Sequence, residues 1–146
     1  MSCTVYLYTD GACKGNPGPG GWGYLLKCGE NSIQDSGSEK DTTNNRMELM
    51  AVINGLSKLN RFCNVIISTD SQYVKNGMEE WIHNWKKNGW KSSNKKPVKN
   101  VDLWQQLDAL VQKFNVSWEW VKGHSGHVEN EIVDTLASNA AESIRC

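Results

Sequence analysis

Runs of apolar residues divide the chain into segments with the spacing of strands and segments with the spacing of helices. Residues 4–10 alternate in polarity and are expected to form a strand that is buried on both faces. Residues 65–69 are a continuous run of apolar and β-branched side chains, which is typical of a central parallel strand. The expected strands are 4–10, 22–27, 32–38, 65–69 and 116–121.

Apolar residues recur with helical spacing in the remaining periodic segments. The expected helices are 46–59, 71–78, 81–87, 101–114 and 128–143. Residues 42–45 offer caps for the first helix, and Ser71 offers one for the second. The stretch 11–21 holds five glycines and two prolines and is expected to turn. Residues 91–100 have no periodicity and are expected to form an exposed loop.

The order of these elements predicts an α/β fold. A helix links the strand at 4–10 to the strand at 65–69, so a right-handed parallel crossover is expected between them. A chain of 146 residues is one domain by length. No apolar stretch is long enough for a membrane span, and no signal peptide is visible, so we expect a cytoplasmic protein. The five cysteines have no spacing typical of a disulfide framework or a zinc site.

The zero net charge conceals a strong asymmetry along the chain. Residues 81–101 contain six lysines and no acidic residue, so the remainder carries 10 basic and 16 acidic side chains, a net charge of −6. A basic segment beside an acidic body favours binding to polyanions.

Two expected strands end in an aspartate. Asp10 follows the first strand, and Asp70 follows the strand at 65–69, so both carboxylates should lie at one edge of the sheet. Such carboxylates repel one another unless a hard divalent cation binds between them. Glu48 and Asp134 lie on expected helices, where a charge near the helix start and a solvated helix face are the simpler interpretations. Taken singly, Asp10 and Asp70 could also just end a strand and begin a turn.

Four stretches of the sequence, taken together, resemble type 1 ribonuclease H. They are residues 9–18, 43–48, 68–74 and 123–134, and the resemblance runs in order along essentially the whole chain. The lysine- and tryptophan-rich segment at about 81–101 is similar to the basic protrusion of the bacterial members. The resemblance implies a single catalytic domain over residues 1–146. It also implies a ribonuclease H-like fold, with a five-stranded mixed sheet flanked by helices on both faces.

The resemblance also implies a reaction, which is hydrolysis of the RNA strand of RNA/DNA hybrids. The enzyme would be a metal-dependent endonuclease that leaves 5′-phosphate and 3′-hydroxyl ends. Asp10, Glu48, Asp70 and Asp134 would hold two Mg²⁺ ions, with Mn²⁺ as a possible substitute. His124 would assist proton transfer or product release, since the pKa of an imidazole lies near the operating pH. The alternative is a surface residue or a structural hydrogen bond, which is the more common role of a single histidine. His127 is expected to be structural.

Substrate-binding residues follow from the same resemblance. The RNA strand, distinguished by its 2′-hydroxyl groups, would be bound by Gly11, Asn16, Asn44, Asn45 and Gln72. The DNA strand and its phosphates would be bound by Thr43, Trp81, Trp85, Lys86, Lys87 and Asn100. Helix capping is the alternative role of Asn44 and Asn45. Core packing is the alternative for Trp85, and it is the role expected of Trp104.

One residue departs from the family pattern. Asp41 stands where well-studied members carry an arginine that binds phosphate, so weaker or more salt-sensitive hybrid binding is expected. Three other functions compete with the nuclease: a non-catalytic hybrid-binding module, a DNA integrase, transposase or resolvase of the same fold, and a metal-binding α/β domain. None of the four carboxylates is missing, and the asparagine and lysine-tryptophan sets favour the nuclease. A monomer without membrane attachment or an obligate protein partner is expected.

Overall fold

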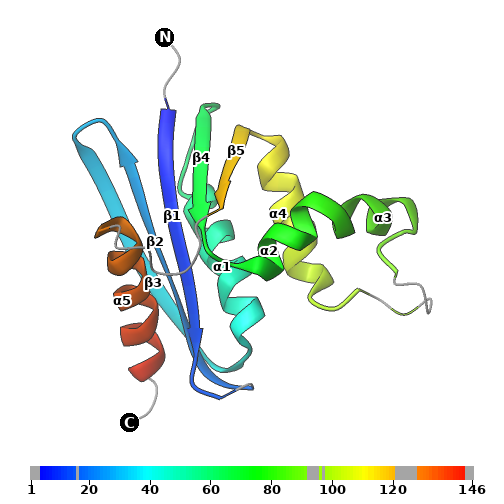
Figure 1. The fold of residues 1–146 in the computed structure, drawn as a ribbon, viewed down its shortest axis with the longest axis horizontal. Helices are drawn as coiled ribbons and strands as arrows, with labels where there is room; N and C mark the ends of the chain where they lie inside the picture. Colours follow the sequence, from blue (N-terminus) through cyan, green and yellow to red (C-terminus); the bar gives the residue numbers. More distant parts are fainter. Residues whose placement is uncertain (1–3, 16, 92–95, 97, 121–127, 144–146) are drawn as a thin grey trace.

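A computed structural model describes residues 4–15, 17–91, 96, 98–120 and 128–143. Its centre is one five-stranded sheet in the order β3-β2-β1-β4-β5 (Figure 1). The strands are β1 (Thr4–Cys13), β2 (Gly18–Cys28), β3 (Asn31–Thr42), β4 (Asn64–Thr69) and β5 (Asn115–Trp120). The first three form an antiparallel meander, whereas β1, β4 and β5 run parallel. The predicted five-stranded mixed sheet is confirmed.

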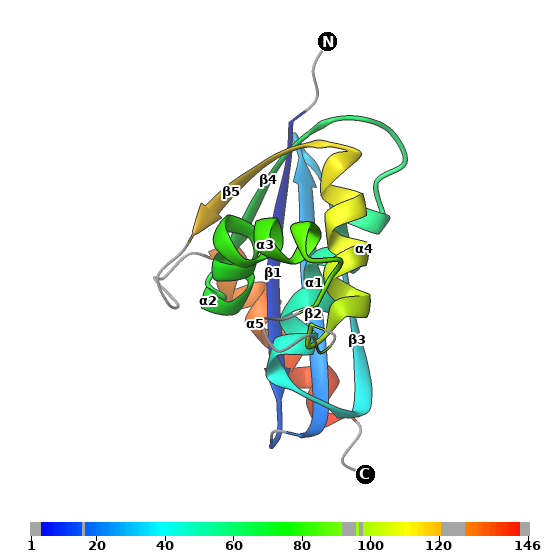
Figure 2. The ribbon, with the colours of Figure 1, turned by 90° about the vertical axis from the view of Figure 1, so that its right-hand side faces the viewer.

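Helices cover both faces of this sheet, as predicted. The helices are α1 (Asn44–Ser57), α2 (Gln72–Asn76), the π-helical turn η1 (Gly77–Trp81), α3 (Ile82–Lys87), α4 (Val101–Gln112) and α5 (Val128–Glu142). Helix α5 packs on β1, β2 and β3, and α1 packs on the opposite face together with α4. Helices α2 and α3 lie near α4, on the side of the molecule away from the meander (Figures 1 and 2).

The main hydrophobic core lies between the sheet and helices α1 and α4. Leu7 and Ile67 contribute from the strands, and Leu49, Val52 and Leu56 contribute from α1; all five are fully buried. These three α1 residues belong to the predicted apolar stripe, so the helical periodicity located the core correctly. The other face of β1 is less covered, and Tyr6 is 44% exposed. The expectation that the first strand is buried on both faces was therefore wrong.

The chain reverses within the glycine-rich stretch at 11–21, as predicted, but both flanking strands extend into this stretch. Strand β1 continues to Cys13 and β2 begins at Gly18, which leaves only a short connection. A Cβ atom on Gly21 would lie 2.4 Å from the carbonyl oxygen of Ala137, and one on Gly23 would lie 2.6 Å from Cβ of Leu136. These glycines therefore allow close packing of α5 on the sheet.

The basic lobe, residues 72–101, differs from expectation in two respects. The predicted helices at 71–78 and 81–87 are joined without a break by η1. Val98 was assigned to an exposed loop but is buried, and its N–H donates to the carbonyl of Trp90 at 3.1 Å. Trp104 is fully buried against the lobe, which confirms its predicted core role. Trp120 of β5 donates its ring N–H to Glu79 of η1 at 2.7 Å, so the edge strand also holds the lobe.

No helix in the described part of the chain is long and apolar enough to cross a membrane.

Replacing Gly21 with alanine is expected to destabilise the protein by about 2 kcal/mol, because the added methyl group would push against the backbone of α5. Urea denaturation measures this change. Gly29→Asn is the control, since Gly29 has a positive φ of 61° that asparagine tolerates and no atom within 4 Å of its Cβ position. Equal stability of the two variants would contradict the packing role of Gly21.

Candidate active site

The four predicted carboxylates come from four different elements that meet at one edge of the sheet. Asp10 lies on β1, and Asp70 directly follows the neighbouring parallel strand β4. Glu48 lies in the second turn of α1, and Asp134 lies in α5. All four are half-buried. The structure therefore brings together residues that are up to 124 positions apart in sequence.

Strand β1 and helix α1 approach each other closely at this edge. A Cβ atom on Gly11 would lie 2.5 Å from the backbone nitrogen of Glu48, so only glycine fits here. The N–H of Gly11 donates to Oδ1 of Asp10 at 2.9 Å. Gly11, predicted to contact the RNA strand, thus also sets the distance between β1 and Glu48 and orients Asp10.

Glu48 is held by two neighbouring polar residues. The side-chain amide of Asn44, one turn earlier in α1, donates to Oε1 of Glu48 at 3.2 Å. Ser71, which follows Asp70, interacts favourably with the Glu48 carboxylate and lowers its pKa. The cap of α1 is Thr43, whose hydroxyl accepts from the N–H of Arg46 at 3.3 Å. Asn44 is therefore not the N-cap of α1. Glu48 is held by a hydrogen bond from Asn44, so it does not simply complement the positive end of the helix.

Burial and mutual repulsion raise the pKa values of two of these carboxyl groups. Desolvation is the main cause at Asp10 and raises its pKa to about 8, with further repulsion from Asp70 and Asp134 and a hydrogen bond with Asp134. Desolvation also raises the pKa of Glu48 to about 7, with a contribution from Asp70. Asp134 therefore interacts with Asp10 and does not simply face solvent. The site disfavours negative charge, and a bound cation would offset this cost.

The residues fit a hard divalent cation in chemistry but would have to adjust in geometry. Carboxylate oxygens are the ligands that such ions prefer. Among the described residues, no group of three or more His, Cys, Asp or Glu side chains is arranged so that it could hold a metal ion without movement. Rotation of the carboxylates between side-chain rotamers would be needed to bring them to a shared point.

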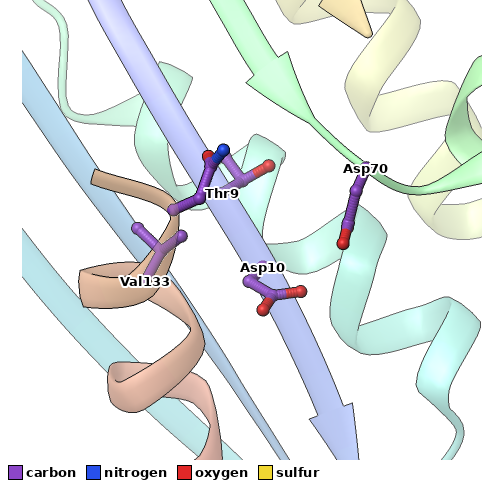
Figure 3. Close-up of a pocket in the computed structure, with 5 residues that line it drawn as sticks. Thr9, Asp10, Asp70 and Val133 are labelled. Carbon is purple, nitrogen blue, oxygen red and sulfur yellow. The ribbon is translucent and has the colours of Figure 1, made fainter. Parts of the chain in front are cut away.

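A small cavity lies between Asp10 and Asp70 (Figure 3). Its volume is about 10 Å³, which is close to the space of one water molecule or a small ion. Thr9 of β1 and Val133 of α5 line it, together with Asn130. Asn130 was missed in the sequence, although its position four residues before Asp134 places it on the same helical face.

The aromatic residues of the lobe form a connected cluster. Trp81 and Trp85 lie with ring centroids 5.8 Å apart, and Tyr73 contacts both Trp81 and the buried Trp104. Both Trp81 and Trp85 are half-buried, and they line a groove with Tyr73, Val98 and Lys99. Both tryptophans therefore pack within the lobe and keep part of their surface exposed. Core packing, the alternative for Trp85, is confirmed, and contact with the DNA strand stays a prediction.

The remaining predicted residues differ in their exposure and in whether they contact other parts of the protein. Lys86 forms an ion pair with Asp108 at 3.3 Å, whereas Lys87 is exposed and has no ion-pair partner within the described ranges. Gln72 is exposed at the start of α2, and Asn45 is half-buried on α1. Asp41 is exposed near the end of β3. Asn16, His124 and His127 lie outside the described residues.

Asn100 is fixed by long-range contacts that the sequence did not reveal. Its Oδ1 accepts from Nη1 of Arg46 at 3.1 Å, and its Nδ2 donates to the hydroxyl of Tyr73 at 3.1 Å. Arg46 also forms a bidentate ion pair with Asp102, at 3.2 and 3.0 Å. This ion pair raises the pKa of Arg46 and lowers that of Asp102. Arg46 lay within one of the recognised sequence stretches, but nothing local identified its partners.

Comparison with known proteins places this arrangement among nucleases. The family model described as RNase H matches residues 2–142. The chain is 66% identical to "Ribonuclease HI" of Neisseria meningitidis serogroup B over 141 residues, which cover 97% of each protein. It is 58% identical to the ribonuclease H of Marinobacter nauticus over 144 residues, covering 99% of this chain and 98% of the relative.

Solved structures agree with the sequence comparison. LC9-RNase H1, a type 1 RNase H with a type 2 active-site motif, matches with a TM-score of 0.84 and 36% identity, covering 98% of this chain and 74% of the other. The N-terminal RNase H domain of a Mycobacterium tuberculosis protein matches with a TM-score of 0.73 and 27% identity, covering 98% and 96% of the two chains.

The raised pKa values predict that stability falls as pH rises when EDTA is present. The stabilising effect of the protonated Asp10 and Glu48 is complete below their unfolded pKa values near 4. It is lost as the pH rises through the folded values of about 7 and 8. Replacing Asp10 with asparagine should flatten this dependence and raise stability at pH 8.5 by about 2 kcal/mol.

Thermal unfolding from pH 5 to 9 measures both effects. Asp35→Asn is the matched control, because Asp35 is exposed and accepts its hydrogen bond from the neighbouring Ser36 N–H. A constant Tm across this range in the parent protein would show that the carboxyl groups are not perturbed.

Proposed function

The chain belongs to the ribonuclease H family, and we propose that it hydrolyses the RNA strand of RNA/DNA hybrids using divalent metal ions held by Asp10, Glu48, Asp70 and Asp134. The observation that carries the proposal is the meeting of these four carboxylates at the edge of the sheet, with the pKa values of Asp10 and Glu48 raised by burial and repulsion. The relatives at 66% and 58% identity support it by their names.

Two Mg²⁺ ions, or Mn²⁺ in their place, would be the cofactors. When bound, they would supply an activated water near neutral pH and Lewis-acid stabilisation of the attacking and leaving oxygens. The chain's own residues orient the ligands: the Gly11 N–H fixes Asp10, and Asn44 fixes Glu48. His124 would move a proton or assist product release, a role that rests on the sequence alone. The products would carry 5′-phosphate and 3′-hydroxyl ends.

The two strands of the hybrid would be bound by two different sets of residues. Asn44, Asn45 and Gln72, with Gly11 and Asn16, would contact the RNA strand, since neutral amides can both donate to and accept from a 2′-hydroxyl. Thr43, Asn100 and the lobe residues Trp81, Trp85, Lys86 and Lys87 would contact the DNA strand and its phosphates. The protein would act as a monomer in the cytoplasm.

The rival functions have less support. A hybrid-binding module without catalysis would not need four carboxylates at one sheet edge, where burial raises the pKa values of Asp10 and Glu48. A DNA integrase or transposase would not explain the aromatic and basic lobe. The exposed Asp41 remains a reason to expect weaker or more salt-sensitive phosphate binding than in relatives with an arginine there.

Replacing Asp70 with asparagine is expected to lower hybrid cleavage by about a thousandfold or more, because the ligand set would lose a charge. Cleavage of an end-labelled RNA/DNA hybrid in Mg²⁺ measures this, with duplex DNA and duplex RNA as comparison substrates. Asp35→Asn should retain the parent activity. Retained binding without cleavage by the parent protein would turn the assignment to a hybrid-binding module.

The lobe should contribute salt-dependent affinity. Replacing Lys87, which is exposed and has no ion-pair partner among the described residues, with glutamine should reduce the slope of log K against log salt by about 0.9, the effect of one lost phosphate contact. Lys58→Gln is the control, since Lys58 is an equally exposed lysine at the C-terminal end of α1. Fluorescence anisotropy with a labelled hybrid in Ca²⁺ measures the slopes. Equal slopes for all three proteins would show that Lys87 does not contact the hybrid.

A further inference from the structure

Asn100 has a left-handed backbone and a side chain with an unusual set of partners. It precedes α4 with φ 61° and ψ 29°, a conformation that asparagine adopts more readily than other non-glycine residues. Asparagine before a helix normally bonds the first free N–H groups with its side chain. Asn100 makes no such capping bond and directs its side chain to Arg46 and Tyr73. The residue is therefore held for a purpose other than capping.

The neighbours fix which way the amide of Asn100 points. The guanidinium of Arg46 can only donate, so it requires the carbonyl oxygen of Asn100 at that position. The hydroxyl of Tyr73 accepts both from Nδ2 of Asn100 and from the ring N–H of Trp104, at 3.1 and 3.0 Å. One N–H of the Asn100 amide then has no partner among the described residues, and it is a donor that suits a phosphate oxygen.

Arg46 also connects the two residues predicted to contact phosphate. Its backbone N–H is capped by Thr43, and its side chain holds Asn100, 54 residues away. Because Asp102 pairs with both guanidinium nitrogens, Arg46 adds little net positive charge to this surface. Its contribution is orientation.

We propose that Arg46 and Tyr73 are positioning residues for substrate binding, which lock the Asn100 amide so that its free N–H faces a backbone phosphate of the hybrid. The inference rests on the proposed function. Arg46 ties the lobe to the start of α1 and so keeps Asn100 at a constant distance from Thr43. Tyr73 of α2 accepts a hydrogen bond from the Asn100 amide and so fixes it from the other side.

The test replaces the ion pair without changing net charge. Arg46→Gln/Asp102→Asn should raise KM for the hybrid by about fivefold with kcat unchanged, the size of one misaligned hydrogen bond. Lys27→Gln/Glu129→Gln removes another ion pair, 3.1 Å long and between β2 and α5, and should leave KM unchanged. Thermal unfolding of both variants shows whether either effect comes from lost stability. Tyr73→Phe is less suitable, since it would also leave the buried Trp104 N–H unpaired.

A double-mutant cycle decides whether Arg46 acts through Asn100. Asn100→Ala alone should raise KM, and adding it to Arg46→Gln/Asp102→Asn should cause little further rise. Additive effects, or an ion-pair variant with the parent KM, would overturn the positioning role while the nuclease assignment stands. No effect of Asn100→Ala would overturn it as well, by removing the contact itself. Loss of hybrid cleavage by the parent protein would instead be a failure of the proposed function.

Discussion

Close contact between helices and the strand backbones beneath them is the constraint on which the site depends. Glu48 and Asp134 reach the sheet edge from opposite faces, so both helices must lie nearer to the strands than ordinary side chains allow. Gly11 makes this possible beneath α1, and Gly21 and Gly23 make it possible beneath α5. A methyl group at any of these positions would meet helix atoms at 2.6 Å or less. The same contacts bury the carboxyl groups that they bring together, and burial is the main cause of the raised pKa values.

The carboxylates at this edge lower the stability of the fold, but they are the groups that the proposed reaction needs. Four acidic residues at one edge repel one another, and the fold holds them there through groups that each have a structural task as well. The Gly11 N–H belongs to a strand, Ser71 caps α2 through its bond to Val74, and Asn44 begins α1. Residues predicted to contact substrate thus also orient the carboxylates, so binding and chemistry share the same few side chains.

The strands and helices could be predicted from the sequence alone because they depend on local patterns, whereas Glu48 and Asp134 were identified as site residues only through the resemblance to ribonuclease H. A hydrophobic run that ends in aspartate marks the end of β4 at Asp70 without knowledge of its neighbours, although β1 continues past Asp10. The packing role of Gly21 and Gly23 was missed because close helix packing and chain reversal both favour glycine, and one sequence does not separate the two. Val98 and the partners of Arg46 depend on contacts across dozens of residues. Such contacts leave no periodic trace, so a single sequence could not place them.

The attachment of the lobe has a thermodynamic consequence. Its root is fixed on two sides, to α4 through the packing of Tyr73 and Trp85 on Trp104, and to β5 through the bond between Trp120 and Glu79. A surface that is already ordered loses little conformational entropy when a ligand binds to it. Contacts made by residues near this root can therefore contribute most of their interaction free energy to affinity. In a lobe on a flexible hinge, part of that free energy would instead offset the entropy lost on binding.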